Sequence, residues 1–310
     1  QSSKATMKST KSFSLQRRVS TAIFVSYDMY LMSLSTMINL FGDEKVRKKN
    51  LRLCHQDLLE KGKLTRFEDL PLGAFVIFVS HQWNGFEHPD SKGVQIECMV
   101  NTFRRLRDGS IDRVDTDPFH TILYKKNRVT ERKEWMQLLS NAYVFYDFWC
   151  QPQVFTEGES EDISHLYHQR DLSIESLGGY VERADCVVIL VPSTTHEDRI
   201  NKYSGRHEFT CYRTYRRRAF CVFEMMATHL SRRKTHPMLL VRSSHSIPQW
   251  ISSLESHKLV VGESNFLCCE LNHKGFKFKT CLRGVLRKVL NTMILKKVEY
   301  LFDFNNVIYA

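Results

Sequence analysis

The sequence predicts an α/β fold built on an open parallel sheet with helices on both faces. Two observations carry this expectation. Four short runs of apolar and β-branched residues have the character of strands that are buried on both sides, as in a covered parallel sheet. Between them lie stretches whose apolar residues recur at helical spacing. Right-handed crossovers through such helices make successive strands parallel.

The four strand candidates and the helix candidates alternate along the chain. We expect strands near residues 75–79, 142–146, 186–191 and 238–241. The first and third, AFVIFV and CVVILV, are continuous apolar runs of the kind that a sheet centre requires. Helices are expected at about 94–107, 174–184 and 219–230, where one face is apolar.

Composition shifts divide the chain into four parts. Residues 1–20 are rich in Ser and Lys and predict a disordered lead-in, and residues 21–70 predict a helical extension, with helix over 29–62. The α/β domain is expected at 71–245, with a polar, basic insertion at 108–140. Residues 246–310 form a carboxyl-terminal extension with a long amphipathic helix at 280–301, and we expect its apolar stripe, 282–294, to dock on the domain.

Charge and cysteine content limit the classes of partner and compartment. The 310-residue chain carries a formal net charge of +11, which attracts polyanions such as nucleotide phosphates but does not by itself indicate specific nucleic-acid recognition. Nine cysteines without the spacing of a disulfide scaffold favour a reducing, cytoplasmic setting. No apolar run reaches the roughly 20 residues that span a bilayer, so we expect no transmembrane segment.

Polar and aromatic residues follow the first two strand candidates, where a structural loop needs only turn formers. Ligands of open parallel sheets bind beyond the carboxyl ends of the strands, so these residues predict a binding site. The candidates after the first strand are Ser80, His81, Gln82 and Trp83, and those after the second are Asp147, Cys150 and Gln153.

Four motifs in this order resemble the Toll/interleukin-receptor (TIR) family and the related heterokaryon-incompatibility domains. They are FVIFVSHQWNG, YDFWCQPQ, SIESLGGYVERADCVVILVP and RRAFCVFEMM, and together they span residues 74–241. The pattern around HPD, residues 88–90, is also similar to TIR-like proteins of protists. The resemblance implies a flavodoxin-like open sheet and a signalling role, often with self-association.

The resemblance also implies a chemistry. In TIR domains that cleave NAD, the Glu of the last motif is catalytic, and the matching residue here is Glu224. A carboxylate suits this role because positive charge develops in the transition state. Trp83 is expected to stack on a base or nicotinamide ring, and Arg218 to hold a phosphate. NAD is thus a possible substrate, with no cofactor expected. A non-enzymatic assembly domain and, more distantly, a nucleoside-processing enzyme stay open, since Phe220 stands where the family usually has Trp.

A separate group of metal-ligand residues lies near the carboxyl terminus. Cys268, Cys269, His273 and Cys281 form a CC-x3-H-x7-C pattern whose residue types suit zinc. Adjacent cysteines are awkward ligands for one tetrahedral ion, and paired CxxC spacing is absent. We therefore expect buried thiols and no metal. The sequence also has no P-loop, no GxGxxG after a strand, no HExxH and no GxSxG.

Overall fold

The structure is a computed structural model that describes residues 25–125, 127–154, 161–232, 236–270 and 281–309. The expected lead-in at 1–20 and His273 lie outside these residues.

A central sheet organises the described part of the chain, where seven strands follow one another in the order β11-β10-β7-β3-β6-β1-β2. The strands are β1 (Tyr30–Ser33), β2 (Thr65–Arg66), β3 (Phe75–His81), β6 (Ala142–Tyr146), β7 (Cys186–Leu190), β10 (Met238–Val241) and β11 (Gln249–Ile251). The four predicted strands form its middle, and β6, β3, β7 and β10 each run parallel to their neighbours within this set. Every residue of β3 is buried, as a strand covered on both faces requires. The predicted α/β open sheet is confirmed.

Strand order determines where a ligand can enter. β3 comes first of the four parallel strands in the chain, yet it lies between β6 and β7. The connection after β3 leads to β6 on one side of β3, and the connection after β6 leads to β7 on the other side. This reversal opens a crevice beyond the carboxyl ends of β3 and β7, the usual binding position in open α/β sheets.

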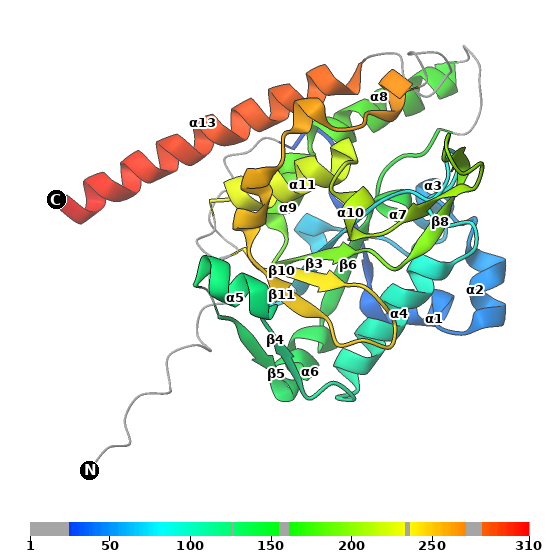
Figure 1. Ribbon diagram of the computed structural model, residues 1–310, viewed down its shortest axis with the longest axis horizontal. Helices are drawn as coiled ribbons and strands as arrows, with labels where there is room; N and C mark the ends of the chain where they lie inside the picture. Colours follow the sequence, from blue (N-terminus) through cyan, green and yellow to red (C-terminus); the bar gives the residue numbers. More distant parts are fainter. Residues whose placement is uncertain (1–24, 126, 155–160, 233–235, 271–280, 310) are drawn as a thin grey trace.

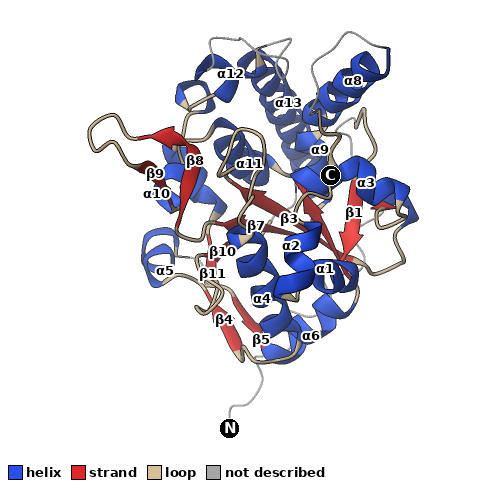
Figure 2. Ribbon diagram, turned by 90° about the vertical axis from the view of Figure 1, so that its right-hand side faces the viewer, coloured by secondary structure: helices blue, strands red, loops and turns tan. Residues whose placement is uncertain are grey.

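Helices cover both faces of the sheet (Figure 2). One face carries α1 (Leu34–Phe41), α4 (Val94–Arg107) and α6 (Arg132–Ser140), and the other carries α9 (Leu177–Arg183) and α11 (Ala219–Leu230). The predicted helices at 94–107 and 219–230 are confirmed. The buried carboxylate of Asp90 caps α4 by accepting from the backbone N–H groups of Val94 at 3.0 Å and Ile96 at 2.8 Å.

The remaining elements are short or lie at the periphery. The helices are α2 (Glu44–Asn50), α3 (His55–Glu60), α5 (Pro118–Tyr124), α7 (Asp147–Cys150), α8 (Glu161–Glu175), α10 (Tyr212–Tyr215) and α12 (Leu267–Glu270), with 3-10 turns η2 (Phe67–Asp69), η3 (Ser253–Lys258) and η4 (Val261–Glu263). Two antiparallel pairs stand apart from the central sheet: β4 (Arg113–Asp115) with β5 (Val129–Glu131), and β8 (Thr194–Ile200) with β9 (His207–Thr210).

The amino-terminal extension differs from the helix expected over 29–62. It begins with β1, which pairs antiparallel with β6 and so covers the edge of the parallel set. Leu31 and Met32 are adjacent in β1 and both are buried, as expected for a strand that is covered on both faces. Ser33 then ends the strand and caps α1, its hydroxyl accepting from the backbone N–H of Thr36 at 3.1 Å. Pairing with β6 decides the structure here, because the apolar spacing alone fits either form.

The insertion and the carboxyl-terminal extension belong to the same hydrophobic core as the sheet. Within the insertion at 108–140, α6 packs against α4 and buries Trp135. The Trp135 ring stacks on that of Trp250 in β11, with centroids 5.5 Å apart. β11 in turn extends the sheet by pairing antiparallel with β10. Segments outside the parallel set thus complete both its edge and one of its faces.

Helix α13 (Leu282–Tyr309) crosses the outside of α9 and α11 (Figure 1). Its apolar stripe from Leu282 to Met293 is buried except for the partly buried Val285, whereas Ile294, expected in the docked stripe, is 43% exposed. Gly178 of α9 permits the close approach, because a Cβ there would lie 2.8 Å from the sulfur of Met293. Neither α13 nor any other helix in the described residues is long and apolar enough to cross a membrane.

Candidate functional site

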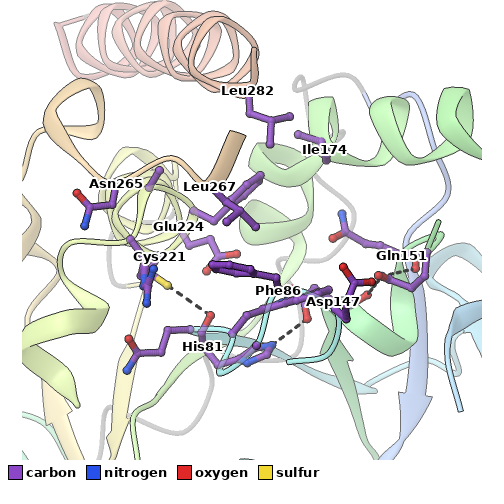
Figure 3. Close-up of a pocket in the computed structure, with 18 of the residues that line it drawn as sticks. His81, Phe86, Asp147, Gln151, Ile174, Cys221, Glu224, Asn265, Leu267 and Leu282 are labelled. Carbon is purple, nitrogen blue, oxygen red and sulfur yellow. Dashed lines mark hydrogen bonds and ion pairs between the residues drawn. The ribbon is translucent and has the colours of Figure 1, made fainter. Parts of the chain in front are cut away.

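A cavity of about 210 Å³ lies at the carboxyl ends of the parallel strands (Figure 3). Its walls come from the loops after β3 and β6, from the start of α11, from the β8–β9 hairpin and from the segments around α8, α12 and α13. The lining residues include His81, Gln82, Trp83, Phe86, Asp147, Gln151, Gln153, Arg170, Ile174, Leu177, His196, Arg199, Arg218, Phe220, Cys221, Glu224, Asn265, Leu267 and Leu282. The cavity is where the strand order predicts a ligand.

Asp147 holds one wall of the cavity together. It is the first residue of α7, directly after β6, and one carboxylate oxygen accepts from Nε2 of His81 at 2.8 Å. The other oxygen accepts from Nε1 of Trp83 at 2.7 Å. Burial raises the pKa of Asp147, but the charge and hydrogen bond of His81 and the bond from Trp83 outweigh it, so the pKa lies below its ordinary value. Asp147 is therefore an ionised group whose lone pairs already have partners.

Glu224 is the second carboxylate of the cavity and has a different environment. It lies on α11 with only 7% of its surface exposed, and it points toward the middle of the cavity near Phe86 (Figure 3). Its Oε2 accepts from the hydroxyl of Ser80 at the end of β3. The Ser80 hydroxyl oxygen is also 2.5 Å from the phenol oxygen of Tyr215. A short chain of hydroxyl groups thus fixes one oxygen of Glu224 from behind.

Burial raises the pKa of Glu224 well above its ordinary value, and the negative charge of Asp147 adds to this, while the Ser80 hydrogen bond opposes it. Among the described residues, no Lys, Arg or His lies within ion-pair distance of the Glu224 carboxylate. The cavity thus contains two carboxyl groups whose pKa values are shifted in opposite directions, an arrangement that enzymes use to separate the roles of two acids. Glu224 is the one that a cationic ligand would ionise.

Arginines gather on the side of the cavity formed by the β8–β9 hairpin and the start of α11. Arg218 is mostly buried; its nearest acidic partner in the described chain is Glu208, at 3.6 Å. Burial lowers the pKa of Arg218, and the positive charge of Arg199 lowers it further. Arg199 itself donates to Glu270 at 3.0 Å. Two cations held close together at a partly dry surface favour binding of an anion.

His196 lies close enough to both arginines to feel their charges, and it stays neutral. Burial lowers its pKa to about 3, with Arg218 and Arg199 adding to the effect. Its Nδ1 accepts from the backbone N–H groups of Asp198 and Arg199, both at 3.1 Å, so Nε2 carries the proton. The side chain supplies a hydrogen-bond donor to the cavity wall without a charge.

The structure brings together most of the residues expected from the sequence. His81, Gln82, Trp83, Asp147, Gln153, Arg218 and Glu224 line the cavity. Ser80 lies directly behind Glu224 and is not part of the lining. Cys150 points into the core, where it contacts the backbone of Tyr146 and Val144, and burial raises its pKa to about 12. Such a thiol is placed to pack and not to react.

Several lining residues escaped the sequence reasoning, among them Phe86 in the loop after β3, Arg170 on α8 and two groups from later parts of the chain. His196 and Arg199 lie in β8, several residues after the end of β7, so a rule that considers only the residues directly after a strand does not reach them. Asn265, Leu267 and Leu282 come from the carboxyl-terminal extension. No motif marks these three, because their position depends on how the carboxyl-terminal extension packs on the helices of the α/β domain.

Comparisons of this chain with protein-family models, with curated proteins and with solved structures give no match.

Proposed function

We propose that this chain is a TIR-like signalling domain that binds NAD in the cavity and cleaves its nicotinamide–ribose bond, with Glu224 as the essential carboxylate. One observation carries the proposal. Glu224 is a buried carboxyl group without a cationic partner among the described residues, and it opens into a cavity that has apolar and aromatic walls and an arginine-lined side. Such a group favours a ligand that brings its own positive charge.

The nicotinamide ring of NAD is a cation, so its entry lowers the pKa of Glu224 and ionises the carboxyl group. When the bond between C1′ of the ribose and the ring nitrogen breaks, nicotinamide takes the electron pair and leaves as a neutral molecule. Positive charge then moves to the ribose, where the Glu224 carboxylate stabilises it. Water adds to C1′ and loses a proton, giving ADP-ribose.

The remaining lining residues match the other parts of this substrate. Trp83 and Phe86 offer aromatic surface to the nicotinamide ring, and Arg199 and Arg218 offer donors to phosphate oxygens. The cavity, at about 210 Å³, is smaller than the roughly 300–1,000 Å³ of pockets that enclose a whole drug-sized ligand. We infer that the nicotinamide riboside end enters, while the adenosine lies outside along the arginine-lined side.

The proposal includes a cytoplasmic setting and self-association. All nine cysteines are free thiols, which is typical of proteins in a reducing compartment. Self-association is proposed from the resemblance to TIR domains alone.

The test is to incubate the purified chain with NAD and to follow nicotinamide and ADP-ribose products by chromatography, both in dilute solution and with the chain clustered on a surface. We expect nicotinamide to accumulate with an equal amount of an ADP-ribose product. If neither condition yields nicotinamide, the enzymatic proposal is wrong. The non-enzymatic assembly domain, which the sequence left open, would then replace it.

A further inference from the structure

Three cysteine thiols meet where the carboxyl-terminal extension joins the body of the protein. Cys268 and Cys269 belong to α12, and Cys281 immediately precedes α13. The sulfur of Cys269 lies 4.0 Å from that of Cys268 and 4.0 Å from that of Cys281. All three sulfurs lie within 4.8 Å of one another. We call these residues the thiol cluster.

The exposure of the thiol cluster differs from the buried thiols expected from the sequence. Cys268 is buried, but Cys269 is half-buried and Cys281 is exposed. The cluster therefore opens to solvent on one side, through which an ion can reach it. Packing in the hydrophobic core therefore explains the position of Cys268 but not those of Cys269 and Cys281.

The spacing of the sulfurs is close to that of a tetrahedral metal site. Zinc–sulfur bonds of about 2.3 Å at tetrahedral angles separate the sulfurs by about 3.8 Å. The separations of 4.0 Å from Cys269 to Cys268 and to Cys281 are only slightly longer. The adjacent cysteines, which their spacing in the sequence makes awkward ligands, both place their sulfurs within 4.8 Å of the sulfur of Cys281. Small side-chain rotations would shorten the sulfur–sulfur separations to those of a zinc site.

We propose that the thiol cluster binds one soft divalent metal ion of the zinc class. Thiolate ligands select zinc over the hard cations magnesium and calcium, which prefer oxygen. Each thiol loses its proton as its sulfur–metal bond forms, so binding releases protons to solvent. No described residue is assigned to the fourth tetrahedral position.

The bound ion would join α12 to the start of α13 and so stabilise one wall of the cavity. Leu267 and Leu282 line the cavity, and each is adjacent in sequence to a cysteine of the thiol cluster (Figure 3). The expected role is structural, because metal bonds formed only in the folded chain contribute directly to its stability. The inference does not depend on the chemistry of Glu224 and stands or fails separately.

The first test measures metal binding by the purified full chain. After reduction of the thiols and addition of zinc, followed by removal of free metal, we expect about one zinc ion per chain by elemental analysis. Replacement of zinc by cobalt should give the strong near-ultraviolet absorption of thiolate-to-cobalt charge transfer. A chain that retains no zinc, or a cobalt form without this absorption, overturns the proposal, and this result needs no variant to fold.

The second test uses matched serine variants. Cys269→Ser and Cys281→Ser should each abolish most of the metal retention and the cobalt absorption. Cys211→Ser is the control: Cys211 is also partly exposed, and it occupies a helix N-cap position at which Ser is favourable. It should bind metal like the unmodified chain. Unchanged metal retention in the Cys269→Ser/Cys281→Ser double variant would contradict the proposal, as would a metal-free chain with a Cys269–Cys281 disulfide in reducing buffer.

Discussion

At the scale of single residues, the environment of the cavity shifts the pKa values of two carboxyl groups in opposite directions. Hydrogen bonds from His81 and Trp83 keep Asp147 ionised and satisfied, with its pKa below the ordinary value. Glu224 receives one hydrogen bond, from Ser80, and burial raises its pKa. Asp147 thereby stabilises the loops that form the wall. Burial of Glu224 shifts its pKa and also lowers the stability of the folded chain, and this combination is common at functional sites.

Glu224→Gln should therefore stabilise the protein, and more so as the pH rises. Below about pH 4.5, the ordinary pKa of the group, Glu224 is protonated in both the folded and the unfolded chain. Above this pH, the unfolded chain loses the proton while the folded chain keeps it. The free energy of unfolding of the wild type therefore falls by about 1.4 kcal/mol per pH unit until the folded-state pKa is reached. Gln has no proton to lose. Denaturant unfolding of both proteins from pH 4 to pH 8 measures the difference.

The ionisation of Asp147 does not affect the stability difference between the wild type and Glu224→Gln. Its lowered pKa stabilises the folded chain above its ordinary pKa of 3.8, and this contribution is lost as the pH falls through the folded-state value. The contribution is present in both proteins and cancels in the difference. A stability difference that stays constant across the pH range would show that the Glu224 pKa is not raised in the folded state.

The residues that sequence reasoning found are those whose position follows from one local rule. Polar groups directly after a buried strand must lie at the sheet edge, which placed His81, Trp83 and Asp147 correctly in the lining. The same rule placed Cys150 there, although its thiol turns inward. Asp147 and Cys150 are the first and last residues of the one-turn helix α7, and the sequence has no signal that the Cys150 thiol turns toward the backbone of Val144.

At the scale of elements, the predictable parts are those whose pattern permits one structure. β3 and β7 are apolar throughout and lie inside the sheet, and α11 has the bounds that its apolar spacing indicates. β1 was missed because its four residues also suit a helix start, and β6 selects the strand form through backbone pairing. Long-range pairing of this kind is not encoded in local spacing.

The contact between α9 and α13 gives a prediction at this scale. Gly178→Val should destabilise the protein by about 1–3 kcal/mol, because the added atoms would overlap Met293 and Val289 of α13. Gly284→Ala, on α13 itself, should instead stabilise it by about 0.5–1 kcal/mol, because nothing lies within 4 Å of the added Cβ and Ala favours a helix. Thermal melts of the two variants give the comparison. Equal stabilisation by both substitutions would mean that α13 does not pack on α9.

At the scale of the whole molecule, the central sheet, the helices on its faces and parts of both extensions share one hydrophobic core. The sequence indicated an α/β unit over 71–245 with extensions on either side, and the parallel strands do lie within that range. The extensions nevertheless supply β1 and β11, which flank the parallel set, and α13, which covers α9 and α11. They also supply Leu267 and Leu282 to the cavity. Local patterns locate the strands, but they do not show what covers the edges.

A fragment of residues 71–245 should therefore fail to fold cooperatively. It would expose the edges of β6 and β10, together with the surfaces of α9 and α11 that α13 buries. Exposed strand edges and apolar helix faces favour aggregation. Circular dichroism during heating, with the full chain alongside, measures this. A fragment that unfolds in one sharp transition at the temperature of the full chain would show that the extensions are dispensable.

The most direct measurement of the central claim is the rate of nicotinamide release from NAD by the wild type and by Glu224→Gln, assayed under the conditions in which the wild type turns over. Gln keeps the size and can still accept from Ser80, but it removes the charge. The account predicts a rate lower by about 10²–10³ or more. Glu60→Gln, at an exposed position on α3, should keep the wild-type rate. Equal rates for the wild type and Glu224→Gln would contradict the account.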